Sequence, residues 1–112
     1  VSNTLGAGFL EKVYVNALCV EFGRSGIPYS RQKQYGIEYK SKIVGNYIAD
    51  IVVYNKLLIE LKALSALNRD HEAQVMNYLK ASGLSVGLLI NFGTSRIGMK
   101  RIVWKHDESN RI

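Results

Sequence analysis

The residues in this sequence best suited to chemistry are two acids and a lysine that lie close together along the chain. Asp50 and Glu60 interrupt two apolar segments, and Lys62 follows Glu60 by two positions. Two carboxylates in apolar surroundings repel each other and cost free energy to desolvate, so another group must offset them. A hard divalent cation does this well, because it takes oxygen ligands and usually keeps several waters. We therefore predict a site for Mg²⁺ or Mn²⁺ held by these acids.

Such a site is suited to hydrolysis of a phosphodiester bond. A bound divalent ion lowers the pKa of a coordinated water and stabilises charge on a phosphate during the reaction. The ammonium group of Lys62 could orient the attacking water or meet the growing negative charge. The alternative is an ion triad at the end of a sheet, in which Lys62 balances one acid and water solvates the other. The residue types alone leave both interpretations open.

Whether the acids meet depends on the loop between the two apolar segments. If residues 54–56 form a three-residue hairpin loop, Asp50 lies opposite Glu60, with Cβ atoms ~5 Å apart. Lys62 then shares the face of Glu60, because side chains two positions apart in a strand point the same way. A two-residue loop would instead place Asp50 opposite Leu61, on the wrong side.

Other elements must position this hairpin. Apolar residues at three- and four-residue steps predict helices over about residues 5–25 and 68–82, with Thr4 and Asn68 as N-caps and Gly83 as the stop of the second. Three antiparallel strands are expected between the helices, in residues 29–61. Two more strands follow at 86–92, covered on both faces, and at 97–104, on a sheet edge. The order α-β-β-β-α-β-β predicts one α/β domain over residues 1–112 with a mixed sheet.

Composition narrows the possible classes of protein. The 112 residues carry 15 Lys and Arg against 9 Asp and Glu, a net charge of +6 that weakly favours polyanionic partners. Cys19, the sole cysteine, excludes an internal disulfide and a cysteine-ligated metal site within the chain, and we expect it to be a small buried apolar residue. No apolar run approaches the ~20 residues that span a membrane, and we expect no signal peptide. We therefore expect a cytoplasmic protein without a membrane partner.

Several separated motifs resemble those of a known superfamily. Ile48-Ala49-Asp50-Ile51-Val52, followed by Ile59-Glu60-Leu61-Lys62-Ala63, resembles the Asp…Glu-x-Lys core of PD-(D/E)XK nucleases. Segments 8–14, 71–79 and 87–93 are similar to motifs of one branch, the GxxExxxR family of small prokaryotic proteins. The resemblance extends from about residue 5 to 104. It implies a restriction-endonuclease-like αβββαβ core, with a central mixed β-sheet flanked by helices.

The resemblance also implies further site residues. It adds Glu11 of the first helix to the metal ligands Asp50 and Glu60, and it places Gln74 of the second helix beside Lys62. Gln74 would hold water or a substrate phosphate. The alternatives are a solvated glutamate on the first helix and a surface amide on the second.

The sequence departs from the family pattern at two positions. Ala49 replaces the proline that precedes the first aspartate, and Val15 stands where the family name has its arginine, so the role of that arginine is open. The family usually has a helix before its first motif, so we expect that an N-terminal helix is missing. Residues 106–112 are expected to form a flexible tail. His71 and Glu72 do not form a zinc HExxH motif, because the fifth position is Val75.

A nucleic-acid partner is expected from the resemblance and from the basic residues. The residues predicted to bind nucleic acid are Arg31, Lys33, Lys40, Lys42 and Tyr78. Arg24, Lys100, Arg101 and Lys105 add to the positive charge, and four tyrosines at positions 29, 35, 39 and 47 could stack on bases or simply pack. Each basic residue taken alone also fits a solvated strand face.

Two functions follow as hypotheses. The first is a metal-dependent nuclease that cuts DNA, with Asp50, Glu60, Lys62, Glu11 and Gln74 as its site. The second is a catalytically silent nuclease-fold module that binds nucleic acid or a protein partner. The resemblance allows a homodimer, since many nucleases of this type pair to cut two strands.

Overall fold

The computed structural model describes residues 10–94 and 96–104. Their elements, in chain order, are α2 (Glu11–Arg24), β1 (Tyr29–Tyr39), β2 (Lys42–Val53), β3 (Leu57–Lys62), α3 (Arg69–Ser82), β4 (Val86–Asn91) and β5 (Gly98–Val103). This confirms the predicted α-β-β-β-α-β-β order. The predicted Thr4 cap, the tail over residues 106–112 and Lys105 lie outside the described residues.

The predicted ends of α3 are confirmed. The Asn68 side chain accepts hydrogen bonds from the backbone N–H groups of Asp70 and His71, and His71 Nδ1 accepts one from the Asn68 N–H in return. This reciprocal cap satisfies donors that a helix start otherwise leaves unpaired. Gly83 ends the helix in the left-handed conformation, with φ of 78°. His71 is therefore a capping residue.

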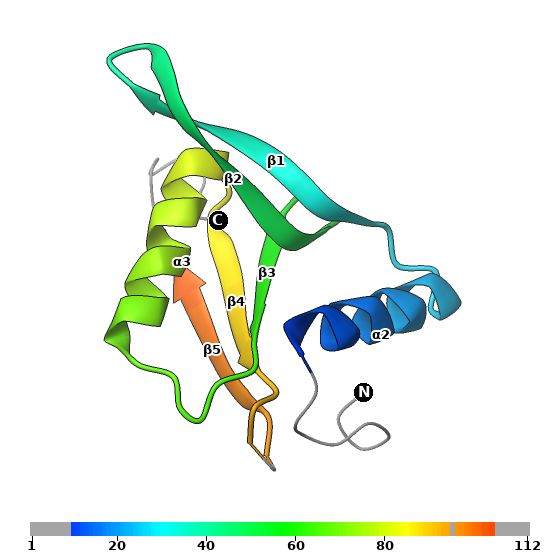
Figure 1. Ribbon diagram of the computed structural model, residues 1–112. Helices are drawn as coiled ribbons and strands as arrows, with labels where there is room; N and C mark the ends of the chain where they lie inside the picture. Colours follow the sequence, from blue (N-terminus) through cyan, green and yellow to red (C-terminus); the bar gives the residue numbers. More distant parts are fainter. Residues whose placement is uncertain (1–9, 95, 105–112) are drawn as a thin grey trace.

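The five strands form one mixed sheet in the order β1-β2-β3-β4-β5. Only β3 and β4 are parallel, because α3 forms the crossover between them, and the other neighbours are antiparallel. β5 lies at an edge of the sheet, as predicted. Figure 1 shows α2 and α3 on opposite sides of the sheet. The sheet thus has an α2 side and an α3 side.

Each side has its own apolar core. On the α2 side, Tyr14 stacks on Phe92 with ring centroids 4.6 Å apart, and Val15 and Cys19 pack beside them. Val15, at the position of the family's arginine, is therefore a core residue here. Burial raises the pKa of the Cys19 thiol, which fits the predicted apolar role.

The α3 side buries a separate cluster. Val75 and Leu79 of α3 pack on Leu58 of β3 and Leu89 of β4. Ile90, the next residue of β4, points to the α2 side, so this strand is covered on both faces as predicted. None of the described helices is long and apolar enough to cross a membrane.

Candidate active site

The β2–β3 hairpin has a three-residue loop, which is the case in which the sequence places the two acids opposite each other. Val53 pairs with Leu57 across the loop, and the ladder continues to Ile51 and Ile59. The turn is tight, because Tyr54 and the next residue both have φ of 55°. This register places Asp50 opposite Glu60, as the sequence predicted.

The alternation of side chains along β2 fails at Asp50. Ile51 belongs to the α2-side core, yet Ala49, two residues earlier, belongs to the α3-side core. In a regular strand these two residues would share a face. On β1, Gln32 lies between the residues that pair with Ile51 and Ala49, and it has φ of 52°. Both strands therefore change direction at the level of Asp50.

At this level of the hairpin the two acids accept hydrogen bonds from backbone N–H groups. The Asp50 N–H donates to Glu60 Oε2 at 3.1 Å, and the Leu61 N–H donates to Asp50 Oδ2 at 2.9 Å. The two carboxyl groups also lie close enough to interact directly, which raises the pKa of Glu60. Asp50 and Glu60 thus form one contacting pair, which we call the acid pair.

The acid pair is electrostatically strained. Only 6% of Glu60 is exposed, and burial raises the pKa of its carboxyl to about 8, with the charge on Asp50 as the next cause. The Tyr47 hydroxyl donates to Glu60 Oε1 at 2.7 Å and partly opposes this rise. Burial in turn raises the pKa of the Tyr47 phenol. Near neutral pH the acid pair therefore retains a proton unless a cation replaces it.

The acid pair fits a divalent cation of the Mg²⁺ type. Such ions are commonly held through one or two carboxylates together with several waters. Within residues 10–94 and 96–104, no group of three or more acidic, histidine or cysteine side chains lies close enough to hold a metal. Glu11 is exposed at the start of α2, a helix that packs on the opposite side of the sheet. The structure therefore does not bring Glu11 to the acid pair.

Lys62 is the last residue of β3 and lies opposite Asn91 of β4. It is half-buried, and strand alternation places it on the side of Glu60. The Phe92 N–H donates to the Lys62 carbonyl at 2.8 Å, which extends the pairing of the two strands by one bond. The predicted lysine and the acid pair are thus gathered on the same side of the sheet.

Asn91 fixes the chain just after Lys62. Its side chain is part of a residue only 2% exposed, and Oδ1 accepts from the N–H groups of Leu64 and Gly93 at 2.9 and 3.1 Å. Its Nδ2 donates to the Leu64 carbonyl at 3.0 Å. A Cβ at Gly93 would lie 2.1 Å from that same carbonyl oxygen, so this contact requires glycine. We call these contacts the Asn91 clamp; sequence reasoning missed it, and a lone asparagine at the end of an apolar strand was the available signal.

Gln74 is linked to the acid pair through two tyrosines. A side-chain hydrogen bond joins Gln74 to Tyr78. The Tyr78 ring stacks on that of Tyr47, with centroids 3.6 Å apart and planes 13° apart. Burial raises the pKa of Tyr78, and the charges on Glu60 and Asp50 raise it further. Sequence reasoning gave Tyr47 only a stacking or packing role and missed its bond to Glu60.

The residues predicted to bind nucleic acid do not form one patch. Arg31 is hydrogen-bonded to Asn16 of α2, and so it lies on the side away from the acid pair. Lys33 donates to Asn55 of the β2–β3 loop at 3.3 Å. The other two cations, at the joined ends of β1 and β2, are Lys40 and Lys42.

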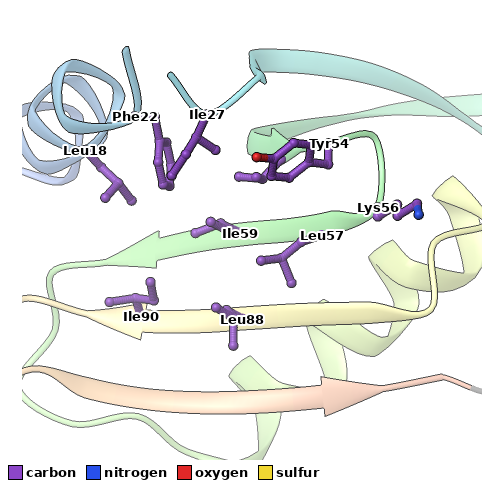
Figure 2. A pocket seen from close by; sticks show the side chains of 10 residues that line it. Leu18, Phe22, Ile27, Tyr54, Lys56, Leu57, Ile59, Leu88 and Ile90 are labelled. Atoms are coloured by element: carbon purple, nitrogen blue, oxygen red, sulfur yellow. The ribbon is translucent and has the colours of Figure 1, made fainter. Parts of the chain in front are cut away.

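A hollow of about 630 Å³ lies on the α2 side (Figure 2). Aliphatic and aromatic side chains line it, among them Phe22, Ile27, Leu57 and Leu88. No carboxylate belongs to its lining. This hollow therefore offers mainly apolar contacts, with Tyr54 and Lys56 as its polar lining residues, and no carboxylate that could hold a metal.

The fold and the acid pair together define a nuclease-like class of α/β protein, and the comparisons with known proteins agree. A family model described as the PD-(D/E)XK nuclease superfamily matches residues 1–102. The chain therefore belongs to the PD-(D/E)XK nuclease superfamily. Membership of the GxxExxxR branch stays a prediction.

One solved structure, titled "Crystal structure of SSO0001", is similar to this chain in fold. The TM-score is 0.67 at 20% sequence identity, over 88% of this chain and 52% of the other. The present chain thus spans about half the length of that relative. None of the curated proteins matches the chain.

Proposed function

We propose that this protein is a metal-dependent nuclease that hydrolyses phosphodiester bonds in DNA. The observation that carries the proposal is the contact between the Asp50 and Glu60 carboxyl groups at the end of the hairpin ladder. Such a buried acid pair is costly without a cation to offset it. Lys62 on the same side and membership of a nuclease superfamily support the same function.

Each residue of the site has a role in this proposal. Asp50 and Glu60 would hold Mg²⁺ or Mn²⁺, which supplies a more acidic bound water and neutralises charge on the phosphate. Tyr47 fixes the orientation of Glu60 through its hydrogen bond. Lys62 places a positive charge where it can meet negative charge that develops on the phosphate oxygens.

Gln74 has a positioning role in the proposal. Its bond to Tyr78 holds its amide near the stacked tyrosines, where it can contact a substrate phosphate or a water. Glu11 has no part, because α2 packs on the other side of the sheet. The proposal therefore rests on five side chains, those of Asp50, Glu60, Tyr47, Lys62 and Gln74, and on the acid pair's need for a cation.

The test is cleavage of circular DNA in the presence of Mg²⁺ or Mn²⁺. Supercoiled plasmid and its single-stranded counterpart are both offered to the wild type, Asp50→Ala and Lys62→Ala, with chelator as the blank. We expect each substitution to lower the rate on the order of 10²–10³-fold. Lys56→Ala is the matched control, because Lys56 is exposed in the hairpin loop and should leave the rate unchanged. Equal rates in all four proteins would remove the catalytic claim.

A second function, binding of nucleic acid without cleavage, is favoured by one observation. Both acids already accept hydrogen bonds from backbone N–H groups of the hairpin, so they also serve the fold. A silent module predicts salt-sensitive DNA binding that Asp50→Ala leaves intact, with no turnover in either metal. The same set of proteins distinguishes the two functions.

A further inference from the structure

The β1–β2 hairpin extends far beyond the strand that supports it. β1 and β2 pair from Tyr29 and Val53 to Tyr39 and Lys42, whereas β2 pairs with β3 only over its last three residues. In Figure 1 the joined ends of the two strands project past the rest of the sheet, above α3. We call residues 36–46 the arm. A two-stranded ribbon is marginally stable alone, so the arm depends on its packing against α3.

A groove of about 950 Å³ lies between the arm and the C-terminal half of α3. Its arm wall contains Ile37, Glu38 and Ile43, and its helix wall contains Asn77, Tyr78, Lys80 and Ala81. α3 packs on the sheet through Val75 and Leu79, and Tyr78 packs beside them, whereas Asn77 and Lys80 are exposed on the outer part of the helix. The volume lies at the upper end of the range for ligand sites.

One wall of the groove is connected to the acid pair through side-chain contacts. Tyr78 lines it, and the Tyr78 ring stacks on Tyr47, whose hydroxyl bonds Glu60. The charges on both acids act on the Tyr78 phenol. A chain lying in the groove would therefore contact Tyr78, which only the Tyr47 ring separates from Glu60.

The lining of the groove fits unpaired nucleotides. Tyr78, Ile37 and Ile43 offer aromatic and aliphatic surfaces, which stabilise exposed base faces but do nothing for the phosphate exterior of a duplex. Lys80 can meet a phosphate, and Asn77 offers an amide to a base edge. Glu38 opposes this with one negative charge, but the arm adds two lysines at its turn, Lys40 and Lys42.

We propose that the arm and α3 together hold a single-stranded segment of DNA or RNA and guide it to the acid pair. The inference rests on the proposed nuclease function and gives it a substrate class: nucleic acid with an unpaired end, flap or gap. Ile43 is 60% exposed although it is large and apolar, which fits a surface that a base covers on binding. Base stacking there is tolerant of sequence, so no base preference follows from it.

The experiment measures binding in chelator, where no cleavage occurs, by the fluorescence anisotropy of labelled oligo(dT), oligo(rU) and a duplex of equal length. The variants are Ile43→Glu, which puts a negative charge in the groove, and Lys80→Ala. Val44→Glu is the matched control, because Val44 is the adjacent arm residue, 63% exposed, and does not line the groove. Lys12→Ala, on the exposed surface of α2, is the control for the lysine.

We expect Ile43→Glu and Lys80→Ala to weaken binding of the single strand about tenfold, with little change for the duplex. The controls should change neither by more than about threefold. The proposal is overturned if the wild type does not prefer a single strand, if Val44→Glu weakens binding as much as Ile43→Glu, or if Ile43→Glu changes only the oligomeric state. The relative affinities for oligo(dT) and oligo(rU) decide between DNA and RNA.

The experiments distinguish failure of the groove proposal from failure of the nuclease proposal. If Lys62-dependent cleavage persists while the groove variants bind oligo(dT) like the wild type, only the groove proposal fails. If the groove variants lose binding while no protein cleaves circular DNA, the groove holds nucleic acid in a silent module. Binding in chelator and cleavage with metal are measured independently, so each proposal is tested by its own measurement.

Discussion

The two sides of the sheet use the same strands for opposite purposes. On β3, Ile59 and Leu61 point into the α2-side core, whereas Leu58 and Glu60 face α3. The α2 side holds an aromatic stack and an apolar hollow. The α3 side holds the acid pair, two stacked tyrosines and the groove under the arm. One hairpin contributes side chains to both sides of the sheet, because neighbouring residues of a strand point to opposite faces.

The two sides of the sheet differ in what burial does to the stability of the fold. Apolar burial on the α2 side stabilises the fold, while burial of the acid pair on the α3 side costs free energy that only a proton or a cation offsets. Sites of this kind often trade stability for activity. Substitutions on the two sides should therefore change stability and cleavage in different combinations.

The largest difference between an effect on stability and an effect on cleavage is expected for Glu60→Gln. The variant removes the buried charge and leaves an amide whose oxygen can still accept from Tyr47. Its NH2 group, in the place of Oε2, can donate to the Asp50 carboxylate but no longer accepts from the Asp50 N–H, and we expect the removal of the buried charge to outweigh this lost bond. Cleavage should fall on the order of 10²–10³-fold, while the melting temperature in chelator rises at pH 8. Circular-DNA nicking and thermal unfolding measure the two effects. Glu21→Gln, on the exposed surface of α2, is the control, and a drop in both stability and cleavage would contradict the expectation.

The pH dependence of the metal-free protein comes next in size. The folded-state pKa of Glu60 is about 8 against an ordinary 4.5, so between these values the folded state binds more protons than the unfolded state. The free energy of unfolding should then fall as the pH rises from about 4.5 to 8, at ~1.4 kcal/mol per pKa unit and a few kcal/mol in all. Denaturant melts in chelator measure this fall.

Two controls tie that fall to the acid pair. Glu60→Gln should flatten the profile across this window, because the titrating group is gone. Added Mg²⁺ should stabilise the wild type more at pH 8 than at pH 5, since the ion competes with a proton for the carboxylates. A wild-type free energy of unfolding that stays constant, or that rises with pH in this window, would contradict the raised pKa of Glu60.

A smaller effect is expected from the Asn91 clamp. Asn91→Ala leaves the Leu64 N–H and carbonyl without their side-chain partners, at a cost of about 1–3 kcal/mol in the free energy of unfolding. Because the clamp fixes the chain just after Lys62, cleavage should also fall on the order of tenfold. The melting shift on adding Mg²⁺ should not change, since the acid pair is intact. Asn46→Ala, exposed on the arm, is the control, and normal cleavage in Asn91→Ala would make the clamp purely structural.

Local patterns predicted much of this molecule. The three-residue loop fixed the contact of Asp50 with Glu60, since hairpin register follows from loop length. Asn68 and Gly83 marked the ends of α3, because caps act through adjacent backbone groups. These features depend on residues near one another in sequence. The helix ends were predicted correctly, whereas the sequence left two loop lengths open and predicted only what each would do to the acids.

Features that depend on tertiary packing were not predicted. Tyr47 is three residues from Asp50, so regular alternation would put it on the other face from that acid; the irregularity at Gln32 and Asp50 turns it toward Glu60 instead. No local signal marked a non-glycine residue for positive φ within a strand. Glu11 matched a motif, yet its distance from the acid pair follows from the side on which α2 packs.

The smallest expected effect compares two adjacent residues of β4. Leu88 is half-buried and lines the α2-side hollow, whereas Leu89 is completely buried against α3. Leu88→Phe should fill part of the hollow and raise the free energy of unfolding by ~0.5–1 kcal/mol, with cleavage unchanged. Leu89→Phe, the same change one residue on, should overpack the α3 side, cost about 1–3 kcal/mol and disturb α3 with Gln74 and Tyr78. Denaturant melts and nicking assays on both variants measure these effects. Equal effects of the two substitutions would contradict the different roles of the two sides of the sheet.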